Sequence, residues 1–264
     1  MKILLSIAIS LLILFSAVRY LEIRSIYFPM KDIMVTPASA GLSYEDTYFA
    51  TSDGIRLNGW FIPAHNARYT VLFCHGNAGN IGHRIKKIEI LNDIGLNVFV
   101  FDWRGYGKSE GVPSEAGLYR DAEAAYKYLT EEKKILPADI VFYGESIGSA
   151  VVIELALKER ARAIITEECF TSVKDMAALV LPIIPCQLLA SRFDSVSKIK
   201  DIKINKLIIH SVDDEIVPYS QGESLFAAAA LPKKFLKLRG GHNTAFLESE
   251  REYREGIKSF LAGL

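Results

Sequence analysis

The sequence predicts an α/β protein with a mostly parallel central sheet, helices on both faces and a small lid insertion. Three observations predict it. Short apolar runs alternate with segments whose apolar residues recur at helical spacing. The runs are apolar throughout, which is typical of strands buried on both faces of a parallel sheet. The 264 residues are enough to build one such domain around a substantial core.

An antiparallel pair is expected where the regular pattern begins. The runs TYFAT and IRLNGWFIP alternate apolar and polar residues and are separated by Asp53-Gly54, a hairpin signal. This pair predicts an antiparallel edge on the sheet.

The remaining runs predict the parallel strands, and the periodic segments predict the helices between them. Strands are expected at YTVLFCHG, NVFVFD, ADIVFYG, ARAIITEE, INKLIIHS and KKFLKLRG. Helices are expected at 81–94, 114–130, 147–159, 219–229 and 246–262. Pro113 and Ser114 are start signals for the second of these helices.

The N-terminal residues differ from the rest of the chain. Residues 3–18 carry no charge and as a helix would span about 24 Å, somewhat less than the roughly 30 Å of a bilayer's hydrocarbon core. We expect residues 1–21 to be a single-pass N-terminal membrane anchor, with the side of the membrane left open by the few flanking charges. A signal segment cleaved on export and a buried helix are the alternatives. Residues 22–46 are then a connector and 47–264 the folded domain.

Composition narrows the classes of ligand. The chain has 31 basic and 31 acidic residues, so no nucleic-acid surface is expected. Cys74, Cys169 and Cys186 form no disulfide framework and lack metal-ligand spacing, and Cys74 ends an apolar run typical of a core position. The chain contains neither of the glycine motifs that bind phosphate groups, Gly-x-x-x-x-Gly-Lys-Ser/Thr and Gly-x-Gly-x-x-Gly. We therefore expect neither a metal nor a cofactor.

The alternation of strands and helices breaks at about 168–204. Met176–Phe193 is apolar and contains Pro182 and Pro185, which predicts an insertion over the carboxyl edge of the sheet, hence a lid. Its apolar side chains would suit a lipidic acyl group, or would pack the underside of the lid itself. These side chains are Leu179, Leu181, Ile183, Ile184 and Leu188.

The stretch VFYGESIGSAV places Ser146 in a Gly-x-Ser-x-Gly motif between an expected strand and an expected helix. A nucleophile on such a turn has a strained backbone, and Gly144 and Gly148 remove side chains that would clash there. The alternative is an ordinary tight turn. A serine hydroxyl is a weak nucleophile unless a base takes its proton.

A histidine and an acid are therefore expected further along the chain, the acid first. His242 follows the last expected strand on the glycine-rich loop LRGGHNTAF and is the candidate base, whereas His210 ends a strand and is expected to be packed there.

The acid is expected in HSVDDEIVP, where Asp214 is the favoured candidate. Asp213 is an alternative, and Glu215 is expected to be solvated or to cap a helix. Glu167 and Glu168, after the preceding strand, form a second option.

An oxyanion intermediate would need backbone donors. The N–H of Ile147 opens a helix, where amides lack partners, and the N–H of Asn77 lies in the glycine-rich loop HGNAGN. Losing one such donor raises a reaction barrier by about 3 kcal/mol. The alternative is that HGNAGN is a glycine-rich turn with no catalytic role.

The polar run FDWRGYGKSEG is interpreted as structural, with Asp102 and Arg104 bracing nearby loops.

Six motifs together resemble the α/β-hydrolase superfamily: HGNAGNIGHR, DWRGYGKSEG, GESIGSA, CFTSVKDMA, DDEIVP and GGHNTAF. They look most like its membrane-anchored, serine-aminopeptidase-like subgroup, which is related to depalmitoylating thioesterases. The resemblance covers roughly residues 45–262 and implies the α/β-hydrolase fold. It also implies a Ser146–Asp214–His242 triad and an oxyanion hole at the Asn77 and Ile147 amides. Such proteins usually have glycine where this chain has Ser211.

The function predicted from these residues is a serine hydrolase that cleaves a carboxylic ester or thioester, with a small-molecule or lipid substrate at a membrane. A serine peptidase and a non-catalytic, membrane-tethered binding module are the alternatives.

Overall fold

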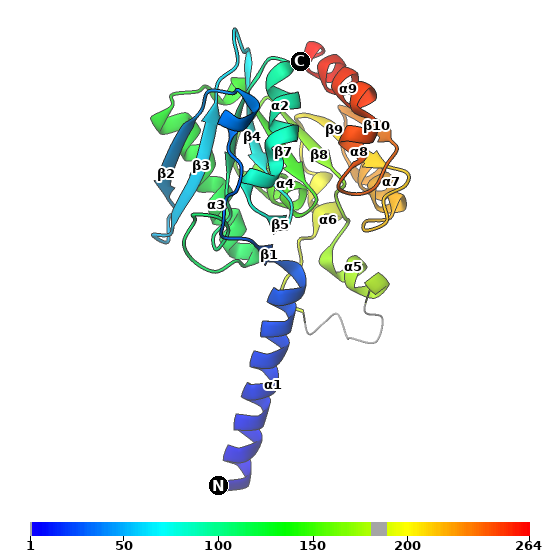
Figure 1. Ribbon diagram of the computed structural model, residues 1–264. Helices are drawn as coiled ribbons and strands as arrows, with labels where there is room; N and C mark the ends of the chain where they lie inside the picture. The colour runs from blue at the N-terminus through cyan, green and yellow to red at the C-terminus, as the bar shows by residue number, and fades with distance from the viewer. Residues whose placement is uncertain (1, 181–188) are drawn as a thin grey trace.

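In residues 2–180 and 189–264, which the computed structural model describes, eight strands form one central sheet (Figure 1). Their order across the sheet is β10-β9-β8-β7-β4-β6-β3-β2. The strands are β2 (Glu45–Ala50), β3 (Arg56–Ile62), β4 (Tyr69–Cys74), β6 (Leu96–Phe101), β7 (Ile140–Glu145), β8 (Ala163–Glu167), β9 (Asn205–Ser211) and β10 (Lys233–Leu238).

The directions of the strands match the prediction. The six strands from β10 to β6 pair in parallel, whereas β3 runs antiparallel to both β6 and β2. The turn between β2 and β3 contains Gly54 at φ +80°, a conformation that glycine adopts without strain. The expected mostly parallel sheet with an antiparallel edge is confirmed.

Helices cover both faces of the sheet and bury a separate apolar cluster on each. One cluster packs α2 (Ile85–Asp93), α8 (Ala245–Glu248) and α9 (Glu250–Ala262) against the sheet. The other packs α3 (Glu115–Lys127), α4 (Ile147–Lys158), α6 (Ser195–Ile199) and α7 (Tyr219–Ala228). At about 25 cal/mol per Å² of apolar surface, burial on both faces is the main stabilising contribution.

The last predicted helix, 246–262, is two helices in the structure. Ser249 separates α8 from α9, because its hydroxyl accepts a bond from the Arg239 N–H and donates one to the Arg239 carbonyl, each at 2.9 Å. These bonds tie the junction to the end of β10, so the chain turns there instead of continuing as one helix.

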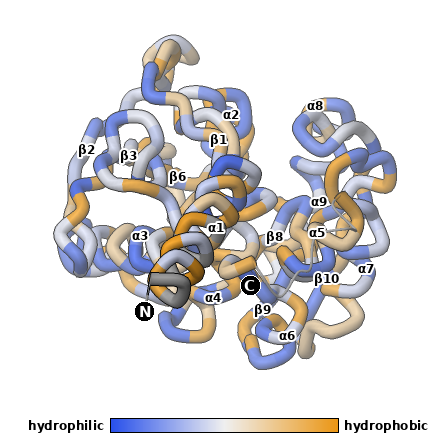
Figure 2. Tube along the Cα trace, turned by 90° about the horizontal axis from the view of Figure 1, so that it is seen from below, coloured by the Kyte–Doolittle hydropathy of each residue, from blue (hydrophilic) through white to orange (hydrophobic). Residues whose placement is uncertain are grey.

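The N-terminal helix α1 (Lys2–Ile26) projects from the body of the protein (Figure 1). Much of it is hydrophobic along its length (Figure 2). Across residues 2–180 and 189–264, no helix combines the length and apolar character that crossing a membrane requires.

A short parallel pair follows α1 and joins it to the body. Here β1 (Phe28–Pro29) pairs with β5 (Ala78–Gly79), which lies in the predicted oxyanion loop. Residues 22–46, interpreted from sequence as a connector, therefore contact the part of the molecule where the candidate site lies.

The expected lid begins with α5 (Val173–Val180) and returns to the body at α6. Part of it lies outside the described residues, namely 181–188, and with it Cys186 and four of the five apolar side chains predicted to suit an acyl group: Leu181, Ile183, Ile184 and Leu188. Cys74 is buried in the core as predicted, and Cys169 is buried as well.

Candidate active site

Ser146 lies on the sharp turn between β7 and α4, where the sequence predicted it. Its backbone has φ 51° and ψ −117°, a strained conformation for a residue with a side chain. Such a conformation costs about 1–3 kcal/mol and persists only where its surroundings impose it. The N–H of Ser146 donates to the Glu167 carbonyl at 2.8 Å, which ties the turn to the end of β8.

Close packing explains both glycines of the motif. A Cβ on Gly144 would lie 2.4 Å from the Ser149 Cα, and one on Gly148 would lie 2.0 Å from the Cys74 carbonyl oxygen. Neither contact is sterically possible, so the turn can form only with glycine at both positions. The same contact brings the start of α4 against the loop that follows β4.

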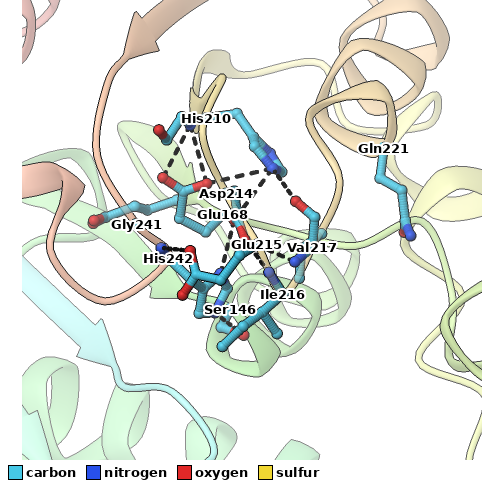
Figure 3. A network of polar contacts seen from close by, with 12 residues as sticks. Ser146, Glu168, His210, Asp214, Glu215, Ile216, Val217, Gln221, Gly241 and His242 are labelled. Carbon is cyan, nitrogen blue, oxygen red and sulfur yellow. Dashed lines mark hydrogen bonds and ion pairs between the residues drawn. The ribbon is translucent and has the colours of Figure 1, made fainter. Parts of the chain in front are cut away.

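Ser146, His242 and Asp214 form a chain of hydrogen bonds (Figure 3). The Asp214 carboxylate can only accept, so the His242 Nδ1 at 2.7 Å from its Oδ2 carries the proton. This tautomer leaves Nε2 as an acceptor, 3.2 Å from the Ser146 Oγ. The imidazole is thereby oriented to take the serine proton.

The three acidic residues of HSVDDEIVP have different positions. Asp214 is buried and its Oδ1 accepts the Ile216 and Val217 amides at 2.8 and 2.7 Å. Asp213 is exposed and pairs with Arg239. Glu215 is exposed and accepts the backbone N–H of His242 at 2.9 Å, which helps to fix the histidine loop. Of the three, only Asp214 contacts the imidazole ring within the described residues.

The second option for the acid, Glu167 or Glu168, separates into two different environments. Glu167 accepts a bond from the Lys87 Nζ at 2.8 Å and another from the Tyr143 hydroxyl. Glu168 lies instead beside Asp214 and His210 (Figure 3). In the part of the chain that the structure describes, neither carboxyl forms a hydrogen bond with His242.

Glu145, the residue before Ser146, lies near two cations. Its Oε2 is 3.3 Å from the Arg84 Nε and 3.4 Å from the Lys87 Nζ. Burial by itself raises the pKa of the Glu145 carboxyl, but the charges of Arg84 and Lys87 outweigh it and lower the pKa to about 2. The residue that immediately precedes Ser146 is therefore an ionised carboxylate.

The predicted oxyanion donors lie next to each other in the fold. Ile147 is the first residue of α4, so its N–H has no partner inside the helix. Cys74 at the end of β4 pairs with Gly144 of β7, and a Cβ on Gly148 would also lie 2.8 Å from the His75 carbonyl. The loop that carries Asn77 therefore begins against the start of α4.

The Asn77 peptide is held on its carbonyl side. Its oxygen accepts the Phe28 N–H at 2.9 Å and the Tyr106 hydroxyl at 2.7 Å, and its side-chain Nδ2 donates to the Ile26 carbonyl at 2.8 Å. No hydrogen bond in residues 2–180 and 189–264 uses the Asn77 N–H as donor. This amide is oriented by its neighbours and available to an oxyanion.

Sequence reasoning missed the residues that hold Asn77. Ile26 and Phe28 lie in the predicted connector, and Tyr106 lies in FDWRGYGKSEG. Glu22, near the end of α1, accepts the amides of Ala190 and Ser191 at the end of the lid segment. Nothing in the local pattern indicates these contacts, since backbone carbonyls and amides supply one side of each of them.

The predicted bracing by Asp102 and Arg104 is present. The Asp102 Oδ1 accepts the Ile81 N–H at 2.9 Å, and Arg104 pairs with Asp53 and with the buried Asp121. These bonds tie the loop that carries Asp102 and Arg104 to the loop at Ile81, to the turn at Asp53 and to helix α3, which contains Asp121.

Three side chains of the site could also approach a cation. One ligand atom each of Glu168, Asp214 and His242 lies within 4.8 Å of the other two. Because the His242 Nδ1 and the Asp214 carboxylate already bond to each other, a cation would have to displace that proton. These three side chains therefore fit the hydrogen-bond chain better than they fit a cation site.

Comparison with known proteins identifies the class of the fold. The esterase Pf2001 of Pyrococcus furiosus superposes with a TM-score of 0.73 over 90% of this chain and 97% of its own, at 20% sequence identity. The fold is thus the α/β-hydrolase fold. A family model described as "Serine aminopeptidase, S33" matches residues 65–193.

Proteins found by sequence comparison have a higher identity to this chain than that esterase has. The protein Rv2307c of Mycobacterium tuberculosis is 37% identical over 90% of this chain and 86% of its own length. The alpha/beta hydrolase domain-containing protein WAV2 of Arabidopsis thaliana is 35% identical over 78% of this chain and 75% of its own. The chain belongs to the α/β-hydrolase family, as its motifs predicted.

Proposed function

We propose that this protein is a serine hydrolase that cleaves a carboxylic ester or thioester through an acyl-enzyme on Ser146. The observation that carries the proposal is the hydrogen-bond chain from Ser146 through His242 to Asp214. Ser146 on a strained turn, a base with a free Nε2 and a buried acid together match the requirements for activating a hydroxyl.

The reaction proceeds in two halves. In the first, the His242 Nε2 takes the Ser146 proton while the Oγ attacks the carbonyl carbon, and the Asn77 and Ile147 amides bind the oxyanion. The intermediate collapses, the leaving oxygen or sulfur takes the proton from His242, and the acyl group remains on Ser146. In the second, water gives a proton to His242 and attacks the acyl carbon. The bond between that carbon and the Ser146 Oγ then breaks, His242 returns the proton to the Oγ, and the acid leaves.

The ester assignment has support from a structural relative, since Pf2001 is an esterase of the same fold. A serine peptidase is the second candidate, because the matching family model is described as a serine aminopeptidase. A lipidic acyl group and attachment to a membrane through the N-terminal segment remain part of the proposal. The exposed side chains of Leu179 and Val180 on α5 offer apolar surface for such a substrate.

Ser146→Ala tests the proposal directly. The variant should lose p-nitrophenyl acetate hydrolysis and fluorophosphonate labelling by at least about a thousandfold, because removing the nucleophile removes the acyl-enzyme, while its Tm stays within a few degrees of wild type. Ser220→Ala, an exposed serine on α7, is the matched control. Aminoacyl p-nitroanilides distinguish the peptidase alternative. Full esterase activity in Ser146→Ala would exclude the assigned nucleophile.

A further inference from the structure

Glu168 lies beside the acid of the proposed triad, in a position that the two half-reactions do not use. It directly follows β8, its side chain is fully buried and its backbone φ is +49°. The Glu168 Oε2 lies 3.3 Å from the His210 Nε2, and the Asp214 Oδ2 lies 3.5 Å from the same nitrogen. Two carboxyl groups therefore converge on one imidazole (Figure 3).

The imidazole between them is neutral. The His210 Nε2 is 2.9 Å from the Val217 carbonyl, which only accepts, so Nε2 carries a proton. The buried Nδ1 has no hydrogen-bond partner within the described residues, and a Cβ on Gly222 would lie 2.4 Å from it. A second proton on this ring would find no acceptor, and burial lowers the pKa of His210.

Among the described residues, the titratable groups that face this pair of carboxyls are two histidines and a third carboxyl. His210 faces it from β9 and His242 from the loop after β10, while Glu167 adds a negative charge from β8. In the part of the chain that the structure describes, neither Glu168 nor Asp214 forms an ion pair with lysine or arginine. One oxygen of each carboxyl lies within 4.8 Å of the other. Two buried carboxyl groups this close and without a cation cannot both be ionised, so they share a proton.

The hydrogen bonds decide which carboxyl holds that proton. Asp214 accepts two backbone amides and the His242 Nδ1–H, all of which stabilise a negative charge. Among the residues that the structure describes, Glu168 accepts one donor, the Ser211 amide, at 3.0 and 3.1 Å from its two oxygens. Burial and the adjacent Asp214 raise the pKa of Glu168, whereas hydrogen bonds to Asp214, the one from His242 foremost, outweigh burial and lower the pKa of Asp214.

We propose that Glu168 is a positioning residue for the reaction: as a neutral carboxylic acid it donates a hydrogen bond to the Asp214 carboxylate and holds it against His242. The proposal rests on the proposed function. The left-handed backbone of Glu168 supports it, because strain at a non-glycine residue persists where the surroundings require that side-chain direction.

The test compares Glu168→Gln and Glu168→Leu in the full chain, with Asp213→Asn as a control for an exposed carboxyl of the same loops. Glutamine keeps a neutral donor, so it should retain at least about a third of the wild-type kcat/KM for p-nitrophenyl acetate at pH 7.5. Leucine removes the donor and should lose about thirtyfold or more, in kcat rather than KM.

Thermal unfolding provides a readout that needs no substrate. A carboxyl whose folded pKa is raised contributes stability below its unfolded pKa, and that contribution is lost as pH rises toward the folded value. Glutamine does not titrate, so Glu168→Gln should have a higher Tm than wild type at pH 8, with the difference shrinking toward pH 5.

Three results would overturn the proposal. Glu168→Gln could lose as much kcat/KM as Asp214→Asn, which would mean that Glu168 acts as a carboxylate. Its Tm at pH 8 could fall below wild type, which would mean that an ion pair with His210 was broken. Folded Glu168→Leu could keep wild-type kcat. None of these depends on Ser146→Ala, so failure of the proposed function is separately visible.

Discussion

Glu145 immediately precedes Ser146 and Glu168 directly follows the neighbouring strand β8. Both are buried, yet their surroundings are opposite. Arg84 and Lys87 lie within 3.4 Å of the Glu145 carboxyl and lower its pKa to about 2. The titratable groups beside Glu168 are another carboxyl and an imidazole without a second proton, and the pKa of Glu168 is raised. Burial alone therefore does not decide whether a carboxyl in this protein is ionised; the cations and hydrogen-bond donors around it do.

The difference begins at two adjacent residues. Glu167 pairs in register with Glu145 on the neighbouring strand, so both side chains lie on the same face and reach Lys87 of α2. Glu168 directs its side chain toward the loop between β9 and α7. One step along the chain thus separates a charged network that supports the serine turn from a neutral acid beside the proposed catalytic aspartate.

The largest effect is expected at Asp214, the member of the Glu168–Asp214 pair that forms a hydrogen bond with His242. Asp214→Asn should lower kcat/KM by about 10⁴-fold, because an amide in place of the carboxylate favours the wrong His242 tautomer. Asp213→Asn, the exposed neighbour, should stay within about threefold. Steady-state kinetics on a short p-nitrophenyl ester measures both, and equal losses in the two variants would contradict the assignment of the acid.

The cation side of the comparison is tested by Lys87→Met. Removing a cation that is 3% exposed leaves Glu145 and Glu167 facing each other with less compensation, which should lower the free energy of unfolding by about 3–5 kcal/mol. Lys86→Met is the matched control, since the Lys86–Glu89 pair is exposed to solvent and contributes little to stability. Urea unfolding compares the two, and equal losses would show that the buried network adds nothing.

A smaller effect is expected in the pH dependence of Glu145. Its lowered folded pKa means that it stabilises the protein above its unfolded pKa of about 4.5 and that this contribution disappears as pH falls toward 2. Glu145→Gln should therefore lower the Tm by several degrees at pH 7, and the difference from wild type should narrow below about pH 4.5. A difference that widens on acidification would contradict the ionised state of Glu145.

Most of the fold was predictable from local pattern. The apolar runs and the helical periodicity between them predicted the parallel strands, the hairpin at Asp53-Gly54 and the covering helices. The break between α8 and α9 at Ser249 was not predicted. It arises because the Ser249 hydroxyl binds the backbone at Arg239, a contact between elements that periodicity does not encode.

The candidate site was predictable in part. Ser146 and His242 were identified from their motifs, and the structure brings both within hydrogen-bond distance. The choice of Asp214 over its neighbours agrees with its burial. The contacts of Ile26, Phe28 and Tyr106 with Asn77 were not predicted, because residues distant in sequence meet there through backbone atoms that any residue possesses.

By itself the sequence determined what depends on neighbours along the chain: the strands, the helices and a serine turn that only glycines at positions 144 and 148 permit. The tertiary structure alone decided the charges of the buried acids. A carboxyl is ionised or neutral according to the cations and donors that surround it, and for Glu145 and Glu168 those groups come from other elements of the fold.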